Sequence, residues 1–278
     1  YTSHAPSTAS IAAAGIGRVV VGTLDPVRAG EGLAELAAAG IEAVHLPYLP
    51  SDVLNEGYLT RLVQGRPFVT LKITLTSQGM VGHARRGSPS LLGVEARRWL
   101  ERERAASDAV MSGAARAEIE DNDLRVHLAG LDDRAAPRVI LAGSRDLELD
   151  VELFRAVSGI PIMVLAAADR PLELRPGVEI VAVEGRRGRP DLRQSLALLA
   201  ARGVSRLLVE AGARLAESFI AGELVDRLHV VDVAADIGRL GVPAALLGRF
   251  EDRIAAARFA EVDRRMLGED KVRTFERS

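Results

Sequence analysis

The stretch LLVEAGARLAESF, residues 207–219, decides the fold, because a short apolar strand meets a helix there at a tight corner. The strand ends on Glu210, Gly212 permits a close backbone approach, and the helix begins almost directly afterwards. In open α/β sheets, ligands bind at the carboxyl ends of strands, where the next helix presents free N–H groups and the positive end of its dipole. The corner therefore predicts a site for an anion such as a pyrophosphate beside a fixed carboxylate.

A purely structural explanation of this corner is the alternative. Gly212 would then only let the helix pack closely on the strand, and Glu210 would cap that helix. A capping role favours Ser, Thr or Asp, whereas a carboxylate at a strand end can accept hydrogen bonds from a ring rich in N–H groups. We therefore favour the binding interpretation.

The rest of the chain alternates strands with helices. Strands are expected at residues 18–22, 41–46, 68–76, 108–113, 137–143, 160–168, 178–184 and 226–235. Helices are expected at residues 7–14, 30–39, 51–64 (capped by Ser51 or Asp52), 94–106 and 192–201. The tail 257–276 indicates antiparallel edge strands, and the Gly-rich stretch 77–93 a long functional loop. This order predicts an α/β fold with a mostly parallel sheet, and the turn at 65–67 divides the chain into domains 1–65 and 66–278.

Composition and motifs narrow the function. The 36 basic and 38 acidic residues give a net charge of −2, which excludes a strong attraction to nucleic acid or to an anionic membrane and favours a small-molecule partner. The chain has no cysteine, and its five histidines lack metal-binding spacing, so no metal is expected. The longest apolar run is too short to span a bilayer, so we expect a cytoplasmic protein. The glycines of GIGRVV (15–20) precede a strand, which indicates a turn and not a dinucleotide fingerprint.

Three stretches in the right order resemble the bifunctional riboflavin-biosynthesis deaminase/reductase family. AAGIGRVVVGTLDPVRAGEGLAELAAAGIEAV (13–44) is similar to the second half of the deaminase domain. LNEGYLTRLVQGRPFVTLK (54–72) is similar to the inter-domain helix and first reductase strand, and VEAGARLAESFIAGELVDRL (209–228) to the reductase's cofactor-binding turn. The resemblance implies a dihydrofolate-reductase-like reductase domain preceded by a partial cytidine-deaminase-like domain. It also implies a homodimer.

The resemblance further implies a reaction and its residues. NADPH would deliver hydride to C1′ of 5-amino-6-(5-phosphoribosylamino)uracil or a related aminopyrimidine. The positions on the substrate side are Ser88, Arg104, Leu124, His127 and Glu210. The positions on the cofactor side are Ser90, Leu92, Arg116, Glu120, Gly212, Ala213 and Arg214. Helical spacing alone does not choose among the arginines of residues 94–106, but the resemblance makes Arg104 the partner of the substrate's 5′-phosphate.

Departures from the family pattern are equally informative. TSHAPST (2–8) stands where the deaminase half has its zinc-binding cysteines, so we expect a deaminase remnant without zinc. Ser90 and Leu92 replace a Trp-x-Thr pair, and Glu120 replaces an aspartate. Arg116 replaces a threonine and is a candidate partner for the 2′-phosphate of NADPH, while His127 replaces an arginine and is a candidate pH-dependent phosphate ligand. The alternative function is a catalytically silent paralogue that binds a nucleotide or riboflavin precursor and acts as a subunit or regulator.

Overall fold

The chain divides into two compact units, Tyr1–Phe68 with Ala197–Ser205, and Val69–Leu196 with Arg206–Ser278. The computed structural model describes residues 7–28, 30–83, 90–120, 123–131, 134–144, 147, 151–155, 159–170, 172, 177–237, 241–243 and 250–277.

The first unit contains a parallel strand pair joined by a helix. Its elements are α1 (Thr8–Ala13), β1 (Arg18–Val21), α2 (Glu31–Ala38), β2 (Glu42–His45) and α3 (Leu49–Gln64). Helix α3 begins two residues before the predicted start, because Pro50 lies in its first turn, where a missing N–H costs nothing. The predicted cap at Ser51 or Asp52 was therefore wrong: Tyr48 occupies the cap position, and the Ser51 hydroxyl donates a hydrogen bond to its carbonyl.

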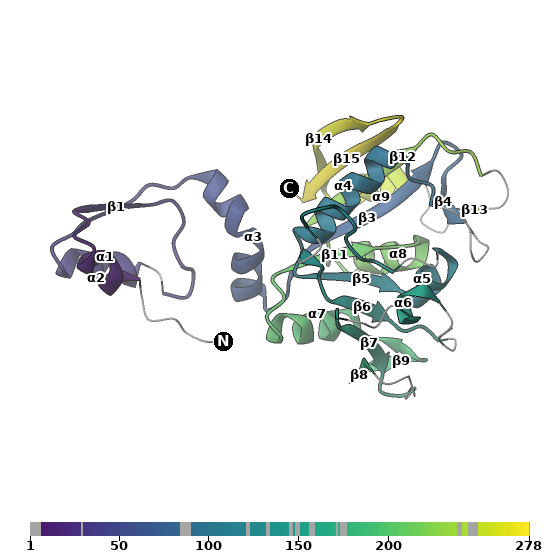
Figure 1. Cartoon of the computed structure of the whole chain (residues 1–278), viewed down its shortest axis with the longest axis horizontal. Coiled ribbons are helices and arrows are strands. Elements are labelled where there is room, and N and C mark those ends of the chain that lie inside the picture. Colours follow the sequence, from purple (N-terminus) through teal and green to yellow (C-terminus); the bar gives the residue numbers. More distant parts are fainter. Residues whose placement is uncertain are drawn as a thin grey trace. The chain divides into compact units, whose positions relative to one another are not determined.

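The second unit is built on a sheet that has nine strands within the described residues. Their order is β14-β15-β12-β3-β11-β5-β6-β7-β8, from the top of Figure 1 downward. The bounds are β3 Phe68–Thr76, β5 Ala109–Gly113, β6 Arg138–Leu141, β7 Ile162–Ala167, β8 Val178–Val183, β11 Arg206–Glu210, β12 Arg227–Val233, β14 Phe259–Leu267 and β15 Asp270–Arg277. Pairs from β11–β5 through β7–β8 are parallel, as is β12–β3, whereas β12–β15 and β14–β15 are antiparallel. The predicted parallel sheet with an antiparallel end is confirmed.

Helices and short strands complete this unit. They are β4 (Met80–His83), α4 (Val94–Ala105), α5 (Ala114–Glu120), α6 (Glu152–Arg155), β9 (Gly185–Arg186), β10 (Arg189–Pro190), α8 (Ala213–Ala221), β13 (Gly241–Pro243) and α9 (Phe250–Ala256). Helix α7 (Leu192–Ala201) begins in this unit, and its residues from Ala197 onward belong to the first unit. The stretch 77–93, predicted to be a loop, contains β4, which pairs with β13. A strand whose partner lies so far along the chain leaves no local pattern in the sequence.

Strand β3 lies in the middle of the sheet and contributes buried apolar residues to the core. Val69, Leu71 and Ile73 are fully buried on one of its faces. Lys72 and Thr74 are also buried, although both are polar, and alternation along the strand places them together on the other face. A buried polar face at the middle of a sheet indicates a functional surface, because burying such groups costs free energy that packing alone does not return.

Replacing Phe219 of α8 tests this core. Its side chain is fully buried, so Phe219→Ala removes apolar contacts and leaves a cavity, and we expect a loss of about 3–5 kcal/mol in the free energy of unfolding. Met266→Ala on β14 is the matched control, because Met266 is 63% exposed and should cost no more than about 0.5 kcal/mol. Urea denaturation measures both values, and equal midpoints would contradict this description of the core.

Candidate active site

A buried ion pair lies where β11 ends. Arg104, in the last turn of α4, donates from Nε to Glu210 Oε1 at 2.6 Å and from Nη2 to Oε2 at 3.1 Å. The two side chains are only 6% and 2% exposed. A two-point contact between guanidinium and carboxylate fixes both groups in direction as well as in distance. Glu210 is therefore held rigidly at the end of its strand.

The charge of Glu210 follows from its neighbours. Burial raises the pKa of the Glu210 carboxyl, but the charge and hydrogen bonds of Arg104, supported by Lys72 and Arg116, more than offset burial and hold that pKa below its usual range. Burial lowers the pKa of Arg104 in turn, and Glu210 more than reverses this effect. Both groups are thus ionised at neutral pH, and Glu210 acts only as a hydrogen-bond acceptor.

A small polar pocket lies beside this pair. It is lined by Lys72, Thr74, Ser90, Leu91, Leu92, Leu100, Arg116 and Glu210. Lys72 Nζ donates a hydrogen bond to Thr74 Oγ1 at 2.7 Å, which orients the ammonium group on the polar face of β3. Arg116 reaches the pocket from α5, and its Nη1 lies close to Gly82 of β4. Among the described lining residues, one carboxylate faces two cations, so the pocket suits a ligand that carries N–H donors and negative charge.

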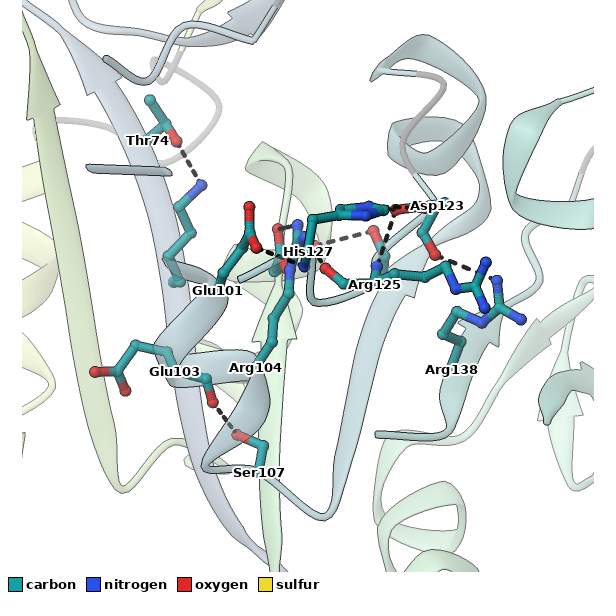
Figure 2. Close-up of polar contacts among 12 residues, drawn as sticks. Thr74, Glu101, Glu103, Arg104, Ser107, Asp123, Arg125, His127 and Arg138 are labelled. Carbon is teal, nitrogen blue, oxygen red and sulfur yellow. Dashed lines mark hydrogen bonds and ion pairs between the residues drawn. The ribbon is translucent and has the colours of Figure 1, made fainter. Parts of the chain in front are cut away.

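The loop after α5 is bound to α4. Arg104 Nη1 donates to the Arg125 carbonyl at 2.9 Å, and Figure 2 shows the Arg104 side chain pointing from its helix toward this loop. Glu101 accepts the backbone N–H of His127 at 2.6 Å. The His127 ring is exposed and lies 3.0 Å from the Asp123 carboxylate. Leu124, the residue after Asp123 on this loop, is buried and adopts a positive φ of 57°. This conformation costs energy for a residue with a bulky side chain.

Arg138 of β6 also donates a hydrogen bond to this loop. Its guanidinium donates to the carbonyls of Asp123 (3.3 Å), Leu153 (3.4 Å) and Ile160 (2.8 Å). Burial, followed by the charge of Arg125, lowers the pKa of Arg138 to about 10, so this arginine stays protonated at neutral pH. Figure 2 shows Arg125 and Arg138 beside Asp123.

The α8 end of the corner is open. Gly212 is the N-cap residue of α8, no side chain caps this helix, and a Cβ built on Gly212 would meet nothing within 4 Å. Ala213 is buried and Arg214 is exposed in the first turn. Uncapped N–H groups at a helix N-terminus, with open space next to the cap residue, fit an anion such as the diphosphate of a dinucleotide.

The structure brings several of the predicted site residues together. Ser90, Leu92, Arg116 and Glu210 line one pocket, with Arg104 bonded to Glu210. Leu124 and His127 lie on the loop that Arg104 and Glu101 hold. Ser88 and the side chain of Glu120 lie outside the described residues. Sequence reasoning missed Lys72 and Thr74, although Lys72 is one of only two lysines in the chain and lies in an apolar strand.

Two further findings concern metals and membranes. Among the residues that the structure describes, no group of three or more His, Cys, Asp or Glu side chains is placed to hold a metal ion. Nor does any helix in the described part of the chain have the length and apolar character needed to cross a bilayer.

Breaking the buried pair should be costly. Glu210→Gln or Arg104→Met leaves an uncompensated charge in the interior, and we expect each to lower the free energy of unfolding by about 3–5 kcal/mol, with the double variant recovering part of the loss. The control is Arg98→Met, which breaks the exposed 3.2 Å pair with Glu95 and should cost less than about 1 kcal/mol. A double-mutant cycle from chemical denaturation measures the coupling, and additive effects of the two single changes would disprove it.

Comparison with known proteins identifies the family. A family described as the RibD C-terminal domain matches residues 67–273. The riboflavin biosynthesis protein RibD of Aquifex aeolicus is 29% identical over 278 residues, which are 98% of this chain and 76% of the relative. The RibD of Haemophilus influenzae is 29% identical over 83% of this chain, which spans only 64% of the relative's length. The 2,5-diamino-6-ribosylamino-4(3H)-pyrimidinone 5′-phosphate reductase of Methanothermobacter thermautotrophicus is 30% identical over 74% of this chain and 96% of its own.

Solved structures agree on the fold. Acinetobacter baumannii RibD has a TM-score of 0.80 at 23% identity, covering 100% of this chain and 78% of that one. The Thermotoga maritima deaminase/reductase also has a TM-score of 0.80, at 24% identity, covering 100% and 76%. The expected α/β reductase fold is confirmed, while a deaminase remnant at 1–65 stays a prediction. By the match over most of its length, the chain belongs to the RibD C-terminal domain family.

Proposed function

We propose that the chain is an NADPH-dependent reductase of the riboflavin pathway that acts on a phosphoribosylamino-pyrimidine. The observation that carries this proposal is the pocket in which Lys72, Arg116 and the ionised Glu210 meet, at the end of the strand that leads into α8. A carboxylate that only accepts hydrogen bonds suits the N–H groups of an aminopyrimidine, and the nearby cations favour the ionised form of that carboxylate. Relatives that are named as reductases of this pathway support the same assignment.

The residues present fit the cofactor. The open N-terminus of α8, with Gly212 as its cap residue, would hold the diphosphate of NADPH through backbone N–H groups. Bound there, NADPH would supply a hydride for C1′ of the open, imine-like substrate, and a proton from water would complete the reduction at the nitrogen. The protein's contribution is to orient the two reactants and to exclude water, which supplies much of the acceleration in reactions of this kind.

We propose that Arg104 acts on the substrate through Glu210. Three of its N–H groups already bond to Glu210 and to the Arg125 carbonyl, so its guanidinium is committed within the protein. It fixes Glu210 in direction and keeps it ionised, so the carboxylate is ready to accept from the pyrimidine. The exposed His127, on the loop that Arg104 holds, then remains a candidate for the phosphate.

The silent paralogue is the second candidate, and one observation favours it. Both oxygens of Glu210 are already bonded to Arg104, so the buried carboxylate is satisfied without a ligand. In that case a nucleotide or riboflavin precursor would bind without being reduced. A homodimer, which the family resemblance implies, and a cytoplasmic location, which the short apolar runs suggest, also stay predictions.

Oxidation of NADPH distinguishes the two functions. With the deaminated and non-deaminated phosphoribosylamino-pyrimidines supplied side by side, we expect loss of nicotinamide absorbance with one of them. Lys72→Met should lower kcat/KM by a factor on the order of 100 or more, because it removes a fixed charge from the pocket. Glu95→Gln, a change on the exposed face of α4, is the control. Stabilisation by ligand, about 2.7 kcal/mol at 100 times the dissociation constant, without any oxidation would establish the silent function instead.

Arg116 provides a separate test of orientation. It shares one small pocket with Glu210, and the two ends of NADPH are too far apart for that pocket to hold both the reacting ring and the 2′-phosphate. If Glu210 holds the pyrimidine, Arg116→Ala should weaken substrate binding and should change the apparent affinities for NADPH and NADH by equal factors. Titrations with both dinucleotides measure this, and a loss confined to NADPH would show that Arg116 binds the 2′-phosphate. Arg98→Ala serves as the exposed control.

A further inference from the structure

The hairpin at the antiparallel end of the sheet carries a buried carboxylate. Asp270, the first residue of β15, is 3% exposed, whereas Glu269 beside it is exposed. Gly268 makes the turn before them with a φ of 67°. Burying a carboxylate costs several kcal/mol unless hydrogen bonds compensate it, so the contacts of Asp270 call for a physical explanation.

Asp270 joins two segments that are distant in the sequence. Its Oδ2 accepts the backbone N–H of Gly93 at 2.7 Å, and its Oδ1 accepts the backbone N–H of Ala234 at 3.3 Å. Gly93 is the N-cap residue of α4, and Ala234 follows the last residue of β12. One side chain therefore ties the hairpin to the start of a helix and to the end of a strand.

Gly93 is fitted to this contact. It has no side chain with which to cap α4, and no side-chain cap bond forms at this helix end. A Cβ on Gly93 would lie 3.2 Å from Asp270 Oδ2, which is tighter than ordinary van der Waals contact. A negative charge near a helix N-terminus is favourable, and Asp270 accepts the N–H of the N-cap residue itself, the bond that the N3 side chain of a capping box makes in other helices.

The segment held by Asp270 forms a wall of the active-site pocket. Residues 90–92, directly before Gly93, line that pocket together with Lys72 and Glu210. Leu91 and Leu92 also line a second cavity of about 480 Å³, which Leu267 and Asp270 line as well. Leu92 also packs in an apolar cluster with Trp99 and Val272, and Leu91 packs against that cluster. Apolar packing thus holds these two side chains, while the hydrogen bond at Gly93 fixes the backbone at the end of the wall.

We propose that Asp270 is a positioning residue for the reductase site: by holding Gly93 and Ala234, it sets residues 90–92 against Lys72 and Glu210. The inference rests on the proposed function. It assigns to the C-terminal hairpin a part in the reaction although Asp270 does not line the pocket itself.

Replacement of Asp270 tests the inference. Asp270→Asn keeps one acceptor oxygen but turns an N–H donor toward a backbone N–H, and Asp270→Ala removes both acceptors. We expect kcat/KM with NADPH to fall roughly 10- to 100-fold in the folded variants, the loss that a misplacement of about 1 Å can cause. Glu269→Gln, the adjacent exposed change, should leave kcat/KM unchanged. Unchanged kinetic constants in folded Asp270→Asn, per active site, would overturn the inference.

Hydrogen exchange separates this inference from the proposed function. In folded Asp270→Asn, the amides of residues 91–93 should exchange faster than in the wild type, while those of β3 keep their rates. Equal exchange rates in the variant and the wild type would overturn the positioning role, whether or not the protein oxidises NADPH. Absence of NADPH oxidation by the wild type would refute the proposed function instead. If neither variant folds, hydrogen exchange at the Gly93 amide of the wild type tests the inference. This amide should be protected as strongly as its neighbours in α4, and exchange at the rate of an unprotected amide would overturn the inference.

Discussion

The structure depends on the buried pair of Arg104 and Glu210. Neither charge is tolerable in the interior alone, so the end of α4 and the end of β11 have to meet in a fixed geometry. The third contact of Arg104, to the Arg125 carbonyl, carries this constraint into the loop that follows α5. One guanidinium thereby sets the relative positions of a helix, a strand and a loop, and the helix and the strand each contribute a residue to the pocket, Leu100 and Glu210.

The same pair gives the site its chemistry. Arg104, Lys72 and Arg116 all favour the ionised form of Glu210, so its buried carboxylate is an acceptor and not an acid. A group that accepts hydrogen bonds and transfers no proton is suited to holding a ring while a hydride is delivered elsewhere on the molecule. Under the proposed function, the stabilising interaction and the functional one are a single arrangement, which gives a reason for a costly buried charge where a strand ends.

Local features of the fold could be predicted from the sequence, whereas long-range pairings could not. The corner at 207–219 was recognisable because the apolar strand, glycine and helix follow one another directly. The partner of Arg104 lies 106 residues away, so helical spacing did not reveal it and the resemblance suggested a phosphate. Strands β4 and β13 were missed for the same reason. Lys72 could have been recognised as a site residue from the sequence, because it is one of only two lysines and lies in the apolar strand β3.

The antiparallel end of the sheet also bears on the site. Strand β15 packs Val272 and Phe275 into the core, whereas β14 of the same hairpin is mostly exposed, so packing alone gives no reason for a buried charge at the hairpin tip. The hairpin tip nevertheless buries a carboxylate that bonds to the start of α4 and to the end of β12. Hydride transfer requires that its reactants be placed within fractions of an ångström. In the irregular segment 90–92, apolar packing holds the side chain of Leu92, and the hydrogen bond at Gly93 holds the backbone that follows. Strands β3 and β11 and helix α5 thus supply the charged groups of the pocket, and hydrogen bonds from the antiparallel end of the sheet hold the backbone of the wall beside them.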